Sequence, residues 1–504
     1  MPLDRRAFLN ACTSAGVASP LFPGILFTLA AQAQDSAATD QSKPPHVTPE
    51  MIDQAAILAS IGPFTAEQKQ MMIDGLIDQN GSCKAIRKLH LPNSVAPAYV
   101  FHPLPAAKRE STGKSSTPEA KIDVGMAPFT PASAAPARIE DLAFAPVTEL
   151  AAQIRERHVT SLALTQMFLA RLKRYDPKLH FVITLTEERA LAQAKAADAE
   201  IAAGNYRGPL HGIPWGAKDL LAVKGYPTTW GAGGFEHQSF DEDATVVQRL
   251  DAAGAVLIAK LTLGALAMGD KWFGGRTRNP WNPAQGSSGS SAGSACAVAS
   301  GCVGFAIGSE TLGSISSPST RCGCTGLRPT FGLVPRTGAM ALSWTMDKLG
   351  PIARSVPDCA LVLEAIHGPD GRDTSVHPAE YHWDPHFDWR SLRIGDLQKE
   401  FDEPKPPKPR EPKPNETTEE KKHREQSDAE AHADFERSLY DRRFDMAALD
   451  KLRSMGVHLI PVDLPDLHWG AMQPLLTAEA AAAFDELTLT GRDRLLTEQS
   501  PDDW

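Results

Sequence analysis

The sequence predicts an α/β fold. Helical and strand patterns alternate along most of the chain, the predicted strands are short apolar runs, and hydrophobic residues make up 42% of the 504 residues. Alternation of strands and helices is typical of a sheet with helices packed against it. The apolar content is close to that of ordinary globular proteins and is sufficient for a sizeable core.

Composition excludes several classes of protein. The 51 Lys and Arg residues against 61 Asp and Glu give a net charge of −10, whereas a nucleic-acid-binding protein usually carries a basic surplus. Seven cysteines are too few in a chain of this length for a disulfide scaffold. Beyond the N-terminus we find no apolar run long enough to cross a membrane, so the pattern is not that of a multi-pass membrane protein.

The N-terminal segment, residues 1–33, has the pattern of a twin-arginine signal peptide. Arg5 and Arg6 precede a moderately apolar stretch, and Ala31 and Ala33 place small residues at positions −3 and −1 of a cleavage site. The alternative is a short amphipathic helix with a chance arginine pair, which the glycines and prolines of the segment disfavour. We expect export across the bacterial inner membrane to the periplasm or cell envelope, either with cleavage after Ala33 or with the segment kept as an anchor.

Cleavage would remove Cys12 and leave an even number of cysteines. They are Cys83, Cys296, Cys302, Cys322, Cys324 and Cys359. An oxidising compartment permits disulfides between them, but the sequence does not pair them. Cys322 and Cys324 lack a second pair at the spacing of a zinc site. We therefore predict small buried thiols.

Residues 34–102 are predicted to form a helical extension ahead of the main domain. Thr48 and Pro49 give a helix start signal, and apolar residues follow at helical spacing. A second helix is predicted over residues 65–77, with its end at Asn80-Gly81, a pair typical of turns.

Residues 103–137 are rich in Pro, Ser, Ala and Lys without apolar periodicity, which predicts a linker. The main domain is then expected over residues 138–504. Its predicted elements are a helix over 147–174, a strand over 181–185, a helix over 187–203, a strand over 213–217, a helix over 244–253, a strand over 255–259, a helix over 292–300 and a strand over 303–307.

Residues 402–430 interrupt this alternation. They are rich in proline and in charged residues and contain few apolar ones, so burial cannot offset the entropy lost on ordering them. We predict disorder there, followed by a helix over residues 431–455 and a strand over 457–462. No obvious finishing element precedes Trp504.

A glycine- and serine-rich segment, residues 286–294, is the strongest candidate for a functional site. Such runs are often flexible linkers, but apolar segments bracket this one and a helical pattern follows it directly, which favours a tight loop inside a domain. It also fits the G-x-S-x-G nucleophile elbow with Ser291 as nucleophile. That elbow needs a buried strand just before it, and the prolines and glycine of residues 279–286 disfavour a central strand.

A third interpretation joins this loop to other segments of the chain. They are G-P-L-H-G-I-P-W-G-A-K-D at 208–219, P-T-T at 227–229, R-N-P-W-N-P at 278–283, G-S-I at 313–315, C-G at 322–323, G-L-R-P-T at 326–330 and L-G-P-I-A-R at 349–354. Together and in this order they resemble the amidase signature family, which includes fatty acid amide hydrolase, malonamidase and the amidotransferase A subunit. The resemblance covers roughly residues 138–356 and weakens toward the C-terminus. It implies an amidase-signature α/β/α fold, with a twisted mixed sheet covered by helices on both faces.

The resemblance also implies a Ser–cis-Ser–Lys triad. The family's lysine, in its G-I-P-x-x-x-K-D pattern, falls on Lys218. The first serine of its S-S-G-G-S loop falls on Ser290, and the nucleophile of its G-G-S-I motif falls on Ser314, at the family's spacing. The cis peptide would be the bond between Gly289 and Ser290.

These residue types suit acyl transfer. A serine hydroxyl is a poor nucleophile until a base removes its proton. A lysine is a base only when neutral, so its usual pKa of about 10.4 must fall by several units, which burial among apolar residues can produce. Ser290 would relay the proton of Ser314 to Lys218, and Ser314 would form an acyl-enzyme that water hydrolyses. The oxyanion would be held by the backbone N–H groups of Thr311, Leu312, Gly313 and Ser314.

Each of these residues also has a purely structural interpretation. Lys218 would form an ion pair with Asp219 on the surface. Ser290 would cap the helix that follows it, and Ser314 would be an ordinary turn serine. His211 lies near Lys218 in sequence but beside a glycine turn, so we expect it to pack and not to serve as the base.

The chain departs from the family pattern at two positions. Leu312 replaces the first glycine of G-G-S-I, which adds bulk beside the predicted oxyanion hole, and Ser316 stands where the family commonly has arginine. Chains of the family also usually continue with further helices beyond a point like Trp504. We therefore expect either an incomplete chain or a reduced C-terminal lobe.

We predict an amide-bond hydrolase that releases a carboxylic acid and ammonia or an amine from a small-molecule amide. The sequence has no Walker loop, no G-x-G-x-x-G after a strand and no zinc spacing, so we expect no cofactor and no metal. We expect no nucleic-acid partner and no stable membrane insertion of the mature chain; the sequence leaves the particular amide and the oligomeric state open. One alternative is an amidotransferase A-type subunit, which the export signal and the acidic balance disfavour. The other is a non-catalytic binding protein on a degenerate amidase scaffold.

Overall fold

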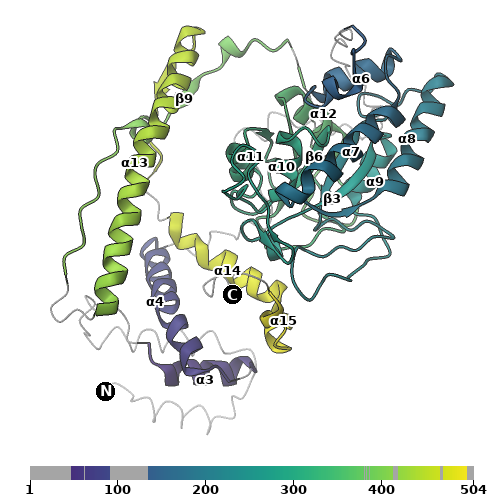
Figure 1. Ribbon diagram of the computed structural model, residues 1–504. Coiled ribbons are helices and arrows are strands. Elements are labelled where there is room, and N and C mark those ends of the chain that lie inside the picture. The colour runs from purple at the N-terminus through teal and green to yellow at the C-terminus, as the bar shows by residue number, and fades with distance from the viewer. Residues whose placement is uncertain are drawn as a thin grey trace, which may run out of the picture. The chain divides into compact units, whose positions relative to one another are not determined.

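The computed structural model describes residues 47–61, 63–90, 134–379, 381, 383–384, 386–412, 418–465 and 469–496 (Figure 1). Its contacts divide the chain into two units, Met1–His90 and Leu91–Trp504. The predicted signal peptide over residues 1–33 and most of the predicted linker over 103–137 lie outside the described residues.

The described part of the first unit contains two helices, α3 (Pro49–Ala59) and α4 (Ala66–Lys88). The Thr48 side chain caps α3, as its start signal predicts, and Thr65 forms a capping box at the start of α4. The predicted end of the second helix at Asn80-Gly81 is wrong, because α4 continues to Lys88. A glycine inside a helix costs only about 1 kcal/mol relative to alanine, which the good helix formers that follow can offset.

The second unit is built on a mixed six-stranded sheet, which confirms the predicted α/β class. Its strands are β1 (Val182–Leu185), β2 (Pro214–Lys218), β3 (Val256–Leu261), β6 (Phe305–Glu310), β7 (Thr325–Gly326) and β8 (Lys348–Ala353), in the spatial order β1-β3-β2-β6-β8-β7. The central strand β2 runs parallel to β3 and β6. Pairing is antiparallel between β1 and β3, between β6 and β8, and between β8 and β7.

Helices cover this sheet. They are α6 (Val147–Arg155), α7 (Ser161–Leu179), α8 (Glu187–Ala202), α9 (Thr245–Ala252), α10 (Ala292–Ala299), α11 (Ser316–Cys322) and α12 (Val356–Ile366). Every residue of β2, β3 and β6 is buried. Because successive side chains of a strand point to opposite faces, burial of all of them requires cover on both faces of the sheet. The core between these layers includes the stacked rings of Trp215 and Phe305.

The predicted helix over residues 147–174 is two helices in the structure. α6 ends at Arg155, and α7 begins at Ser161 after Thr160, whose side chain accepts a hydrogen bond from the backbone N–H of Ala163. This capping threonine is the sequence signal that marks the break. The other predicted elements between residues 181 and 307 agree with the structure to within a few residues at their ends.

The prediction of disorder over residues 402–430 is wrong from Thr418 onward. There α13 (Thr418–Ser454) begins well before the predicted start at residue 431. Lysine, arginine and glutamate favour helices, and opposite charges four residues apart add to this. Lys421 lies 3.8 Å from Glu425, and Arg424 lies 3.9 Å from Asp428. A high content of charged residues was therefore not sufficient to predict disorder in this segment.

The remaining described elements are short. They are η2 (Ile139–Leu142), η3 (Ala265–Ala267), β4 (Lys271–Trp272), β5 (Gly275–Arg276), η4 (Trp389–Ser391), β9 (Ile394–Asp396), η5 (Gln398–Phe401), β10 (Leu459–Pro461), η6 (Trp469–Met472), α14 (Gln473–Ala483), α15 (Asp485–Leu489) and η7 (Asp493–Leu495). β10 confirms the strand predicted within residues 457–462. The helices α14 and α15 were not predicted from the sequence, although Phe484 and Leu487 belong to the main core.

Candidate active site

The candidate site is centred on Lys218, the last residue of β2. Because β2 lies between β3 and β6, its end is enclosed, and the Lys218 side chain is completely buried. Three serine hydroxyl oxygens surround its Nζ, those of Ser290 at 2.8 Å, Ser309 at 2.8 Å and Ser291 at 3.0 Å. The contact with Ser290 was expected from the sequence, whereas no role was predicted for Ser309.

Burial lowers the pKa of Lys218 to about 7, while the nearby carboxylates of Asp347 and Glu310 act in the opposite direction. The surface ion pair with Asp219 that the sequence allowed is not formed. Asp219 instead lies 2.7 Å from the Nζ of Lys260, and both side chains are fully buried. Among the described residues, no carboxylate is in contact with Lys218, so only the more distant charges of Asp347 and Glu310 oppose the effect of burial on its pKa.

The buried pair of Asp219 and Lys260 anchors the end of β2. Asp219 Oδ2 accepts hydrogen bonds from the backbone N–H and the hydroxyl of Thr229, at 2.8 Å and 2.6 Å. Lys260 donates to Pro227 O and to Thr228 Oγ1. These contacts give the P-T-T segment at residues 227–229 a structural role. The segment connects Asp219, the neighbour of Lys218, with Lys260 of β3. Lys260 itself was not predicted from the sequence to take part.

The serine-rich loop brings Ser290 to Lys218. The peptide bond between Gly289 and Ser290 is cis, as the resemblance implied. Gly289 allows a close approach of backbones, since a Cβ there would lie 1.7 Å from Gly269 O. Ser290 does not cap α10, because the N-cap residue is Ser291, whose side chain makes no capping hydrogen bond.

Ser291 is held by β6. Its Oγ accepts a hydrogen bond from the backbone N–H of Ser309 and donates to Ser309 O, each at 3.1 Å. Residues 287–290, directly before it, form no strand. The strand that a nucleophile elbow requires is therefore missing, and the alternative in which Ser291 is the nucleophile is not supported.

Ser314 lies in the turn between β6 and α11, and its exposed fraction is only 9%. The backbone N–H of Ser291 donates to Ser314 O at 3.1 Å, so a main-chain contact joins the two serine-bearing segments. Gly313 has a φ of +90°, a conformation that glycine adopts without strain. The neighbouring Leu312 side chain is 68% exposed, so its bulk lies at the surface and not in the core.

Glu310, at the end of β6, holds this turn. Its Oε2 accepts hydrogen bonds from the N–H groups of Ile315 and Ser316, at 2.8 Å and 2.9 Å, and from the Ser316 hydroxyl at 3.1 Å. Burial raises the pKa of Glu310, but hydrogen bonds from the N–H groups of Ser316, Ile315 and Gly313 outweigh it and lower the pKa overall. Ser316, at the family's usual arginine position, thus has a local structural partner that sequence reasoning missed.

Asp347 holds the start of the turn after β6, at Thr311. It accepts hydrogen bonds from Thr311 Oγ1 at 2.5 Å and from the N–H groups of Leu342 and Ser343, at 2.7 Å and 3.1 Å. Ser343 in turn donates to Glu479 of α14. The backbone around Thr311 is therefore fixed from β8's side by a carboxylate that no sequence motif indicated.

His211 packs as expected and lies away from the serines. Its ring is buried, its Nδ1 accepts from the backbone N–H of Arg207 at 3.1 Å, and its Nε2 lies 3.3 Å from Glu200. Burial lowers the pKa of His211, and Glu200 acts against this effect. The ring is engaged by neighbours of its own, which fits a packing role.

Cys296, Cys302, Cys322 and Cys359 are buried free thiols, which confirms the prediction for these four, and burial raises the pKa of each. The prediction is wrong for Cys83, which is exposed, and Cys324 is only partly buried. Within the described ranges, no group of three or more His, Cys, Asp or Glu side chains is placed to hold a metal ion. No helix in that part of the chain is both long and apolar enough to span a bilayer.

Comparison with known proteins identifies the family. A family model described as Amidase matches residues 163–422, more than half of the chain. The chain belongs to the amidase signature family. The matched residues include Lys218, Ser290 and Ser314, so the candidate site lies within the amidase region.

Curated relatives of this amidase-family chain belong to amidotransferases. It is 44% identical over 261 residues to the A subunit of the glutamyl-tRNA(Gln) amidotransferase of Methylococcus capsulatus, covering 51% of this chain and 53% of that protein. It is 36% identical over 341 residues to the corresponding protein of Anaeromyxobacter dehalogenans, covering 66% and 63%. The chain spans about half the length of the first of these relatives.

Solved structures of amidases share the fold. The native peptide amidase of Stenotrophomonas maltophilia matches with a TM-score of 0.57 and 30% identity, over 72% of this chain and 74% of that one. A structure of a vestigial protein complex related to an s-triazine catabolic enzyme matches with a TM-score of 0.58 and 29% identity, over 71% and 72%. The mixed α/β architecture of this amidase-family chain is that of amide-acting enzymes.

The buried ion pair beside the site gives a first testable prediction. Lys260→Met leaves the Asp219 carboxylate buried without its cation, which costs about 3–5 kcal/mol of unfolding free energy in comparable cases. Lys224→Met removes a lysine from an ion pair in which both side chains are mostly exposed, and its effect should be much smaller. Thermal denaturation of both variants measures this difference in stability. Equal losses of stability would show that the buried pair contributes no more than the exposed one.

Proposed function

We propose that this protein is an amide-bond hydrolase with a Ser–cis-Ser–Lys triad, in which Ser314 is the nucleophile, Ser290 the relay and Lys218 the base. The observation that carries the proposal is the buried hydrogen-bond contact of 2.8 Å between Lys218 Nζ and Ser290 Oγ. Family membership and the likeness to a peptide amidase support it.

A neutral lysine can also satisfy its three hydroxyl partners. A neutral amine offers two N–H donors and one lone pair, whereas an ammonium offers three donors and no acceptor. The Ser291 hydroxyl donates to Ser309 O, so its oxygen is free to accept from Lys218. If Lys218 also donates to Ser309 Oγ, its lone pair is left for the Ser290 proton. This arrangement is the one that a proton relay through Ser290 needs.

In the proposed reaction, Ser290 passes its proton to Lys218 and takes the proton of Ser314 as that residue attacks the amide carbonyl. The oxyanion is held by the backbone N–H groups of Thr311, Leu312, Gly313 and Ser314. The proton returns through Ser290 to the leaving amine, and water then hydrolyses the acyl-enzyme. In the free protein the Gly313 N–H also contributes to holding Glu310, so Thr311 and Leu312 are expected to carry more of the oxyanion's charge.

The pH dependence of acylation tests the role of Lys218. Its pKa is lowered to about 7, and only the neutral amine accepts a proton. The rate of acylation should therefore fall as pH decreases through about 7 and reach a plateau above it. Stopped reactions with a fluorophosphonate probe, sampled across this range, measure the rate. A rate that does not change around neutral pH would contradict the proposed base.

Labelling by the same probe tests the nucleophile and the relay. Ser314→Ala should abolish labelling, and Lys218→Ala and Ser290→Ala should slow it by about 10²–10⁴-fold, the usual contribution of general acid–base catalysis. Ser291→Ala is the matched control and should still be labelled at Ser314. Peptide mass spectrometry locates the adduct: an adduct on Ser291 favours the elbow, and no labelling of the folded wild type favours a non-catalytic scaffold.

A second candidate function is that of an amidotransferase A-type subunit. The 44% identity to the A subunit of a glutamyl-tRNA(Gln) amidotransferase favours it. Ammonia release from glutamine, compared with release from a panel of simple amides by the chain alone, separates the two. Hydrolysis of simple amides without any partner supports the hydrolase, whereas activity restricted to glutamine supports the amidotransferase.

We also propose that the chain is exported to the periplasm or cell envelope through its twin-arginine segment. The support is Arg5 and Arg6 with the small residues at Ala31 and Ala33. Cell fractionation of the wild type and of the Arg5→Lys/Arg6→Lys variant tests this. Equal cytoplasmic retention of both would contradict export.

A further inference from the structure

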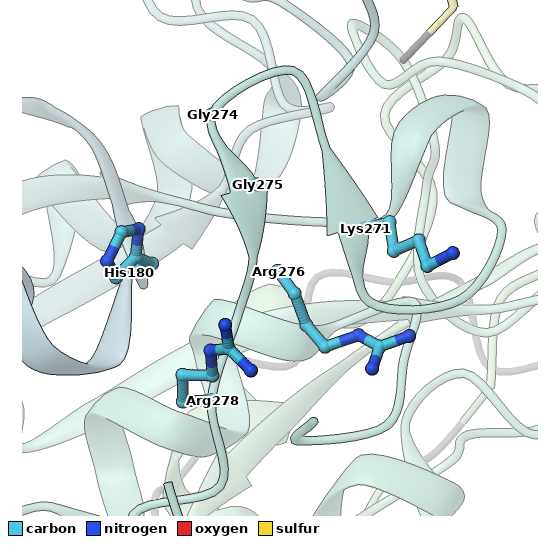
Figure 2. A pocket seen from close by; sticks show the side chains of 6 residues that line it. All are labelled: His180, Lys271, Gly274, Gly275, Arg276 and Arg278. Atoms are coloured by element: carbon cyan, nitrogen blue, oxygen red, sulfur yellow. The ribbon is translucent and has the colours of Figure 1, made fainter. Parts of the chain in front are cut away.

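A cationic cavity of about 350 Å³ lies beside the β4–β5 hairpin, and the proposed reaction does not use it. It is lined by His180, Lys271, Gly274, Gly275, Arg276 and Arg278. Figure 2 shows these side chains grouped around the hairpin, with Lys271 and Arg276 extending in the same direction from it. None of these six described lining residues is acidic.

The charges of this cavity are only partly compensated. Arg276 Nε lies 3.2 Å from Asp270, which does not line the cavity. Across the residues that the structure describes, neither Lys271 nor Arg278 forms an ion pair. Cations that lie close together repel one another unless an anion neutralises them. The cavity therefore has the charge of an anion site.

The α7 C-terminus, next to His180, opposes this charge. A helix C-terminus carries about −0.5 of an elementary charge. The carboxylate of Asp176 is engaged there by the N–H groups of Phe181 and Val182, each at 2.9 Å. Lys271 and Arg278, which form no ion pair among the described residues, each bring a positive charge, and together these exceed the charge of the helix end.

The backbone that carries these side chains is held in place. The hairpin pairs Lys271 with Arg276, and its Trp272 is buried. The Arg278 N–H donates to Leu179 O at 2.8 Å, and Arg278 O accepts from the thiol of Cys296 at 3.3 Å. The site is therefore formed before a ligand arrives, which reduces the entropy lost on binding.

Gly275 leaves the main chain of the hairpin open to an anion, whereas Gly274 makes room for a buried ring. Gly275 has a φ of +112°, and no atom lies within 4 Å of the position of a Cβ there. Gly274 packs on the ring of Trp272, where a Cβ would lie 2.1 Å from the ring. Arginine forks match the oxygens of phosphate groups, and lysine binds them as a point charge. A dianion suits several cations better than a single carboxylate does.

We infer that this cavity binds the phosphate group of a small molecule. Its volume exceeds what one phosphate ion needs, so an organic phosphate monoester fits the site better than inorganic phosphate. The cavity also adjoins the serine loop: Asp270, the partner of Arg276, accepts a hydrogen bond from the Ser288 N–H at 3.2 Å. The site is nonetheless independent of the proposed hydrolysis, because none of its lining residues belongs to the triad.

Isothermal titration calorimetry of the full chain at low salt tests this inference, with glycerol phosphate, inorganic phosphate and acetate as separate ligands. Glycerol phosphate should bind at least as tightly as inorganic phosphate, and both more tightly than acetate. Lys271→Gln/Arg278→Gln should weaken phosphate binding at least tenfold. Arg174→Gln/Lys195→Gln removes the same charge from exposed positions on α7 and α8, and should change the affinity less than twofold.

Three outcomes would overturn the inference. They are no phosphate binding by the wild type at millimolar concentration, equal weakening in both double variants, and binding of RNA or anionic vesicles without binding of glycerol phosphate. If a thermal melt shows that the Lys271→Gln/Arg278→Gln variant does not fold, the His180→Gln variant tests the inference in its place. It is expected to bind phosphate at least threefold more weakly than the wild type. Retained affinity in that variant would count against the site. Probe labelling of Ser314 reports on the proposed function separately.

Discussion

The site depends on a buried amine at the end of the central strand, which has hydroxyl partners and, in the part of the chain that the structure describes, no carboxylate in contact. Desolvation penalises the charged form of Lys218, and its amine forms hydrogen bonds with the hydroxyls of three serines. Both conditions follow from the position of β2 between β3 and β6. A lysine at the edge of the same sheet would reach water and keep its proton.

Carboxylates close to the site act as structural ties. Asp219 is neutralised by Lys260, Glu310 is saturated by the turn after β6, and Asp347 holds Thr311. Each one fixes the backbone next to a candidate catalytic residue. The site is rigid because buried acceptors hold its loops, and none of those acceptors forms a hydrogen bond with the Lys218 amine.

Much of this could be predicted from the sequence, because motif order and short apolar strands are local signals. The strands around Lys218 and the position of Ser290 follow from them. Lys260, Glu310 and Asp347 could not be found in this way, since their roles depend on pairing across strands and turns far apart in the chain. The helical start of α13 at Thr418 was missed because charge-rich composition suits both disorder and a solvated helix, and only the i,i+4 spacing separates the two. The break before α7 was missed because the apolar pattern continues across it, although Thr160 marks it.

Lys218 and Lys260 lie on adjacent strands, and both are wholly enclosed, yet only one of them contacts an acid. A count of lysine residues in the sequence treats both side chains as cations. Burial lowers the pKa of Lys218 to about 7, whereas Lys260 has the carboxylate of Asp219 beside it. The formal net charge of −10 counts both lysines as full cations, although burial disfavours the charged form of the one at the end of the central strand.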